Sequence, residues 1–85
     1  MTDGGAGWQV ALELDCREML CPMPVIELAR HLGDVGVGEL LAVVAHDPAA
    51  AVDVPAWCRM KGQDYVGADT ADDGAPRFVV RRVGP

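Results

Sequence analysis

The 85-residue sequence has few aromatic residues, no excess of basic residues and no long apolar run. Only four aromatic side chains occur, so a folded core has to consist mainly of Val, Leu, Ile and Ala. The net charge of −6 argues against a nucleic-acid-binding protein, because phosphate contacts need a basic surface. No stretch approaches the ~20 apolar residues of a membrane span, and the first residues lack a basic region. We expect a cytoplasmic protein without nucleic-acid or membrane contacts.

The sequence has three cysteines, an odd number, which argues against a closed disulfide framework. Its cysteines indicate either reactivity or core packing. A hydrophobic content of 51% with 24% charged residues is ordinary for a globular protein. We expect a single domain over residues 1–85, with a flexible N-terminus at residues 1–7.

Hydrophobic periodicity predicts a strand, a helix and a second strand. Residues 8–15 alternate apolar and polar side chains, which predicts a strand with one buried face. A helix follows over residues 22–32, with Gly33 as its stop and an apolar face made by Val25, Leu28, Ala29 and Leu32. The continuous apolar run at residues 40–45 is typical of a central strand.

The side-chain directions of that central strand define an expected open face of the sheet. If Leu40, Ala42 and Val44 face the helices, the alternate residues of the run lie on the open face. A partner or a second copy of the chain would then cover them. We expect a monomer or a weak homodimer.

Asp47 and Pro48 have the residue types of a helix N-cap and first position. They predict a second helical region through residue 61 that ends at Gly62. Pro55 interrupts it, and Asp53 is able to cap a fresh turn, so one broken helix and two short helices fit equally.

Two further strands are predicted around the Asp73-Gly74 pair, which marks a hairpin. The order β-α-β-α-β-β predicts an α+β two-layer sandwich, with two helices on one face of a mixed four-stranded sheet. Arg77, Arg81 and Arg82 on the last strand indicate a solvated sheet edge or a small docking patch for an acidic partner.

Cys21 lies in the stretch LCPMP at the expected start of the first helix. A residue before proline is pushed out of the α region, as a helix N-cap requires, and Pro22 suits the first helical position. The positive end of the helix dipole favours the thiolate, which is the nucleophilic form. The pattern predicts a rigid, accessible and moderately activated Cys21. It also fits a helix start in which the cysteine is only a small apolar residue.

The composite LDCREMLCPMPVIEL at residues 14–28 resembles the TusA/SirA family of small sulfur-carrier proteins, which share a Cys-Pro-x-Pro motif. The resemblance extends to AHDPAAAVDVPAWCRMKG at residues 45–62 and covers about residues 12–83. It implies that Cys21 accepts a sulfane sulfur as a persulfide and passes it on. The implied donor is a cysteine desulfurase or a rhodanese-type protein, and a downstream protein is the acceptor. No cofactor or metal is implied, and Cys21 is the one expected catalytic residue.

The sequence departs from the family pattern beside this cysteine. Glu18 replaces the usual glycine, and Leu20 stands where a polar or basic residue is common. The Glu18 carboxylate is expected to raise the pKa of the Cys21 thiol, and Arg17 is able to offset it. Met19 and Met23 are expected to form an apolar rim for docking, or Met19 to pack in the core.

The other two cysteines leave alternatives open. Cys16 is close enough in sequence to form a redox pair with Cys21 or to resolve its persulfide, although C-x4-C is not a dithiol oxidoreductase spacing. We favour an incidental role for Cys16 and a packing role for Cys58. A thiol redox protein and a non-catalytic binding module are therefore the alternatives to a sulfur carrier.

No zinc-type spacing connects these cysteines with His31 and His46, which we expect to be solvated or locally hydrogen-bonded. Asp47 and Asp53 are expected to act as helix caps first and as partner contacts second.

Overall fold

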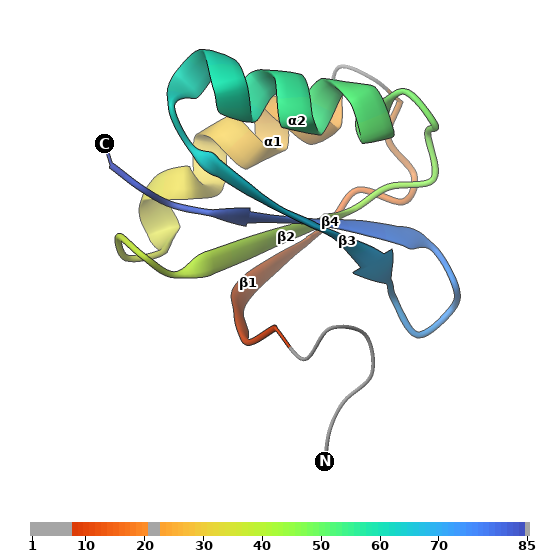
Figure 1. Cartoon of the computed structure of the whole chain (residues 1–85). Coiled ribbons are helices and arrows are strands. Elements are labelled where there is room, and N and C mark those ends of the chain that lie inside the picture. The colour runs from red at the N-terminus through yellow and green to blue at the C-terminus, as the bar shows by residue number, and fades with distance from the viewer. Residues whose placement is uncertain (1–7, 21–22, 85) are drawn as a thin grey trace.

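Two helices cover one face of a four-stranded sheet (Figure 1). The structure is a computed structural model that describes residues 8–20 and 23–84. Its strands are β1 (Val10–Asp15), β2 (Leu40–Val44), β3 (Asp64–Thr70) and β4 (Pro76–Arg81). Its helices are α1 (Met23–His31) and α2 (Ala50–Lys61), and a 3-10 turn, η1 (Leu32–Asp34), follows α1.

The sheet is mixed and has the strand order β1-β2-β4-β3. β1 and β2 run parallel and are joined through α1, whereas β4 is antiparallel to both β2 and β3. The predicted α+β class, element order and hairpin are therefore confirmed. Gly74 has a φ of 86° in the turn between β3 and β4, a conformation that glycine adopts without steric cost.

The apolar core lies between the sheet and the helices. Leu12 and Leu14 of β1 are partners of Leu41 and Val43 in the parallel register, and all four side chains pack in or against the core cluster. Leu41, Val43 and Ala45 therefore face the helices, and the predicted orientation of β2 was wrong. A continuous apolar run has no alternation, so its own sequence does not indicate which residues point to which side.

The face of the sheet opposite the helices, called the open face here, is covered in part by Trp8. Ala42 and Val79 are fully buried there, outside the core cluster. Gly67 is the partner of Val79, and a Cβ atom on Gly67 would lie 2.9 Å from Cη2 of Trp8. Trp8 precedes β1, and its ring lies beside Gly67 on the open face. It therefore does not extend the core-facing side of β1, as the alternation predicted.

α1 packs against the core through Leu28, which is fully buried, and through Pro24. Val25 and Leu32 are partly buried against the same cluster. Ala29 is exposed, so its predicted place on the apolar face was wrong. The α-helical turns end at His31 and continue as η1, which includes Gly33.

α2 is one continuous helix that contains Pro55. Pro55 donates no hydrogen bond to the carbonyl four residues earlier, but that residue, Ala51, is exposed to water. The helix begins at Ala50, two residues later than predicted, because the chain first forms a turn with three-residue backbone bonds, from the amide of Ala50 to the carbonyl of Asp47 and from the amide of Ala51 to the carbonyl of Pro48. The Asp47 carboxylate accepts a hydrogen bond from the amide of Ala49 in this turn. Gly62 ends the helix in the left-handed conformation, as predicted.

Candidate functional site

The candidate site lies where β1 leads into α1. Cys21 and Pro22, the residues singled out in the sequence, lie outside the described residues. The structure describes the chain on both sides of them, up to Leu20 and from Met23 onward. The site is therefore defined by its neighbours.

Hydrogen bonds connect the end of β1 to the start of α1. The amide of Cys16 donates to the carbonyl of Val44 at 2.8 Å, and the amide of Met19 donates to the carbonyl of Cys16 at 3.1 Å. The amide of Met23 donates to the carbonyl of Leu20 at 2.9 Å. Backbone bonds therefore hold the chain on either side of the Cys-Pro pair.

Apolar side chains are exposed on both sides of that pair. Leu20 is 75% exposed, and Met23 and Ile26 of α1 are also exposed. Met19 instead packs against the core cluster. Of its two predicted roles, docking rim and core packing, the structure shows core packing. Leu20, Met23 and Ile26 thus offer an apolar contact surface beside the motif.

Cys16 and Cys58 are both buried, and each is 1% exposed. Burial raises the pKa of the Cys16 thiol, and the carboxylates of Glu27 and Asp15 raise it further. Burial likewise raises the pKa of Cys58 to about 11. Neither sulfur is an accessible thiolate at neutral pH. This confirms core packing for Cys58 and is contrary to a redox role for Cys16.

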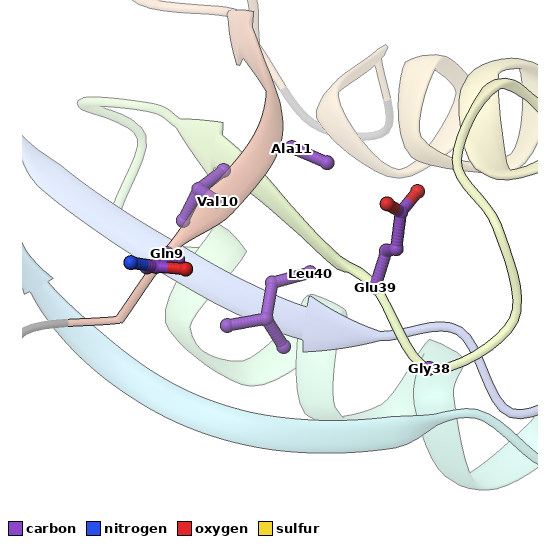
Figure 2. Close-up of a pocket in the computed structure, with 6 residues that line it drawn as sticks. All are labelled: Gln9, Val10, Ala11, Gly38, Glu39 and Leu40. Atoms are coloured by element: carbon purple, nitrogen blue, oxygen red, sulfur yellow. The ribbon is translucent and has the colours of Figure 1, made fainter.

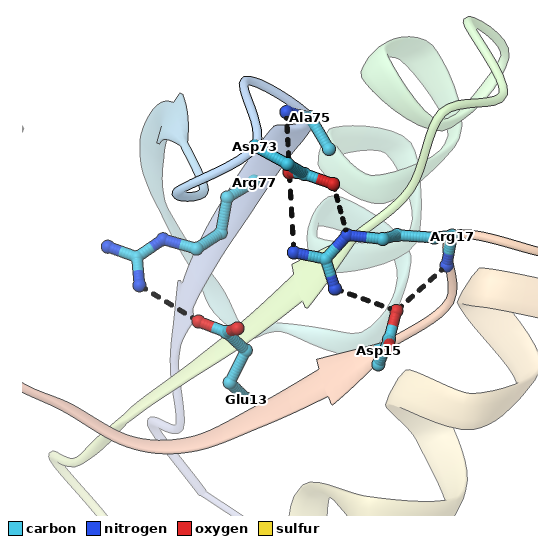
Figure 3. Close-up of polar contacts among 6 residues, drawn as sticks. All are labelled: Glu13, Asp15, Arg17, Asp73, Ala75 and Arg77. Atoms are coloured by element: carbon cyan, nitrogen blue, oxygen red, sulfur yellow. Dashed lines mark hydrogen bonds and ion pairs between the residues drawn. The ribbon is translucent and has the colours of Figure 1, made fainter.

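Arg17 is held by two carboxylates, at the end of β1 and in the β3–β4 turn (Figure 3). Its Nε donates to Asp73 at 2.9 Å and its Nη2 to the other oxygen at 3.4 Å. Its Nη1 lies 3.0 Å from Asp15, which also accepts a hydrogen bond from the Arg17 amide. We call Asp15, Arg17 and Asp73 the Arg17 cluster.

These contacts change the ionisation of both acids. A backbone hydrogen bond from Arg17, followed by its side chain, lowers the pKa of Asp15. The amide of Ala75 and then the Arg17 side chain lower the pKa of Asp73. The sequence suggested that the Arg17 guanidinium offsets the effect of Glu18 on the Cys21 thiol. In the structure, Arg17 is instead bound to the carboxylates of Asp15 and Asp73. Sequence analysis missed Asp73, which lies 56 residues from Arg17.

The arginines of the last strand do not form a docking patch. β4 is an inner strand of the sheet, and Arg77 makes two bonds to Asp69, at 2.8 and 2.7 Å, and one to Glu13 at 3.0 Å. The pKa of Arg77 is raised, first by Asp69. Arg81 pairs with Asp64, and Arg82 donates to backbone carbonyls. The sheet-edge and acidic-partner interpretations were therefore wrong, since these cations are bound within the chain.

The histidines show no metal-binding arrangement. His31 lies between Glu27 and Asp34 at the C-terminal end of α1, with Nδ1 2.8 Å from Asp34, and His46 is exposed. Among the described residues, no three His, Cys, Asp or Glu side chains are grouped to hold a metal ion. Neither described helix is long and apolar enough to cross a membrane.

A depression of about 410 Å³ lies at the other end of the sheet (Figure 2). It is formed where β1 and β2 begin, and its lining residues are Gln9, Val10, Ala11, Gly38, Glu39 and Leu40. Because β1 and β2 are parallel, this end is remote from the point where β1 leads into α1. The depression contains no thiol or imidazole and is not part of the candidate site.

Comparisons with known proteins identify a family for almost the whole chain. The family model of sulfurtransferase TusA matches residues 12–82. A candidate sulfur carrier protein of Archaeoglobus fulgidus is 37% identical over 71 residues, which cover 84% of this chain and 92% of that protein. The sulfur carrier protein TusA of Pseudomonas syringae is 36% identical over 73 residues, 86% of each chain.

A solved structure shares the fold. The crystal structure of a SirA-like protein from Desulfitobacterium hafniense matches with a TM-score of 0.71 at 18% identity, over 86% of this chain and 99% of that one. Together, the family match and these relatives support a role in carrying sulfur between a donor and an acceptor protein. The chain belongs to the TusA sulfurtransferase family.

Proposed function

We propose that this protein is a sulfur carrier that accepts a sulfane sulfur on Cys21 and relays it to an acceptor protein. One observation carries the choice of residue: the other two cysteines are buried and have raised thiol pKa values. Cys21 also occupies the Cys-Pro-x-Pro motif beside exposed apolar side chains.

Sulfur transfer through Cys21 needs two displacement steps and no net oxidation. The Cys21 thiolate attacks the terminal sulfur of a donor persulfide; a new S–S bond forms at Cys21, and the donor leaves as a thiolate. An acceptor nucleophile then attacks the terminal sulfur of the Cys21 persulfide. This second step breaks the S–S bond and regenerates the Cys21 thiolate. No general base is required once the thiol is ionised.

The donor in this proposal is a cysteine desulfurase or a rhodanese-type protein, and the relay takes place in the cytoplasm, which keeps free thiols reduced. Leu20, Met23 and Ile26 are the exposed apolar residues available for contact with either partner. The protein acts as a monomer or a weak homodimer.

A loading experiment tests the assignment. Incubated with a cysteine desulfurase, its pyridoxal cofactor and cysteine, the protein is expected to gain the mass of one sulfur atom. Fragmentation must locate the added sulfur on Cys21, because Cys16 is close enough to share the same peptide. Cys21→Ser is expected to abolish loading with the fold retained, since serine is nearly isosteric and is a good N-cap.

The remaining cysteines provide the controls. Cys58→Ala is expected to load normally but to be less stable, because a buried side chain is shortened. Cys16→Ser is expected to load as well, and loss of transfer in this variant would favour a two-thiol redox protein. Equal loading of all three cysteines, or none with several donors, would instead favour a non-catalytic binding module.

A further inference from the structure

The Arg17 cluster joins two parts of the chain that are far apart in sequence. Arg17 lies two residues after the end of β1, in the segment of residues 16–20 that leads to Cys21. Asp73 lies in the turn between β3 and β4, where its Oδ1 also accepts a hydrogen bond from the amide of Ala75 at 3.0 Å. The same turn is closed by backbone bonds between Ala71 and Ala75 and between Gly74 and Ala71. These bonds within the turn thus hold Asp73 in position independently of its contact with Arg17.

The segment of residues 16–20 that contains Arg17 is connected to α1 by the backbone bonds described above. Its amides and carbonyls contact Val44 of β2 at one end and Met23 of α1 at the other. The side chain of Arg17 is the segment's ionic connection to the β3–β4 turn (Figure 3). A shift of Arg17 would therefore be passed along residues 18–20 toward the Cys-Pro pair.

We propose that Arg17 is a positioning residue for sulfur transfer. Through its bonds to Asp73 and Asp15, Arg17 fixes the segment of residues 16–20, which leads to Cys21. The proposal rests on the function proposed above for Cys21. Two-point contact between a guanidinium and a carboxylate restricts orientation as well as distance, which a single lysine contact does not do. Arg17 does not react with sulfur.

Two substitutions separate positioning from electrostatics, because they change the local charge in opposite directions. Asp73→Asn removes a negative charge, which by itself lowers the pKa of the Cys21 thiol and speeds its alkylation by iodoacetamide. Arg17→Gln removes a positive charge, which by itself raises that pKa and slows alkylation. If Arg17 acts by positioning, both variants transfer sulfur from a desulfurase persulfide about two- to five-fold more slowly at pH 7. The double variant is then no slower than either single variant.

Asp64→Asn is the matched control. It breaks the Arg81–Asp64 pair, another partly exposed Arg–Asp contact, at the end of the hairpin away from the β3–β4 turn. It is expected to transfer sulfur at the wild-type rate. Asp73→Glu keeps a carboxylate opposite Arg17 and is expected to retain most of the rate. Circular dichroism checks that each variant is folded. If Asp73→Asn is not folded, Asp73→Glu takes its place in the comparison.

Each other outcome overturns the proposal. Wild-type transfer rates in both Arg17→Gln and Asp73→Asn would do so and leave the role of Cys21 intact. Faster transfer in Asp73→Asn with slower transfer in Arg17→Gln would show that charge alone acts. Equal slowing by Asp64→Asn would indicate a general loss of stability. Absence of sulfur loading in the wild-type protein would overturn the proposed function and this inference together.

Discussion

The two faces of the sheet are built by different chemistry. On the helix face, apolar side chains of β2 and β4 pack against Leu28, Val54 and Trp57. On the open face, the same two strands carry buried Ala42 and Val79 beside the ion pairs of Arg77 and Arg81. The helix face depends on close packing, whereas the open face depends on Trp8 and on arginine contacts.

This difference explains why β2 lacks alternation. A strand that is buried on both sides retains apolar residues at every position, and residues 41–45 are fully buried. β1 lies at the edge of the sheet and alternates. The charged ends of Arg77 and Arg81 pair on the open face with Asp69 and Asp64. An open face is thus not necessarily a polar face.

The helix face is expected to give the largest loss of stability on substitution. Leu28→Ala removes a fully buried side chain of the core and is expected to lower the free energy of unfolding by about 3 kcal/mol. Ile26→Ala, on the exposed side of the same helix, is the control, with an expected loss below about 1 kcal/mol. Urea denaturation measures both. Equal losses would show that α1 is not packed through Leu28.

The open face is expected to be most sensitive at Gly67. Gly67→Ala would place a Cβ atom 2.9 Å from the Trp8 ring at a φ of 154°, with an expected loss of about 2 kcal/mol. Trp8→Ala removes the close contact, so the two substitutions are expected to be non-additive in urea denaturation. Gly33→Ala, with no atom within 4 Å of the new Cβ, is the control. Additive losses would contradict contact between Trp8 and β3.

The sequence predicted the elements well, because their signals are local. The hairpin at Asp73-Gly74 and the stop at Gly62 follow from residues beside them. The orientation of β2 did not follow, because it depends on the register with β1. Ala29 was assigned to the core because helical spacing alone does not fix the width of a buried face.

The site was predicted less completely than the fold. The motif pointed to Cys21 from adjacent residues, and the packing role of Cys58 was anticipated. The partners of Arg17 and Arg77 were not, because Asp73 and Glu13 approach them only after the sheet forms. Ion pairs over such separations have no local signal. Arg77 was therefore assigned to a solvated sheet edge or an acidic partner, and Arg17 to an offset of Glu18.

The smallest expected effects concern pH, and they distinguish the helix face from the Arg17 cluster by the direction of the change. On the helix face, Cys58 has a pKa of about 11, against 9.0 for the free thiol. Between these values the unfolded chain loses the proton and the folded chain keeps it, so stability falls as pH rises from about 9 to 11. In the Arg17 cluster, at the end of β1 and in the β3–β4 turn, Asp15 and Asp73 have a pKa below the ordinary 3.8. Their contribution is present above pH 3.8 and is lost as pH falls below it.

Melting temperatures measured across the pH range test this difference with one variant for the helix face and one for the Arg17 cluster. Cys58→Ala is expected to reduce the alkaline decrease and to leave the acid decrease unchanged. Asp73→Asn is expected to do the reverse, because it removes one of the acids that Arg17 keeps ionised. The alkaline decrease is not expected to vanish in Cys58→Ala, since burial also raises the pKa of Cys16 and of Tyr65, which pack against the same core. If both variants altered the same part of the pH profile, the helix face and the Arg17 cluster would not titrate independently.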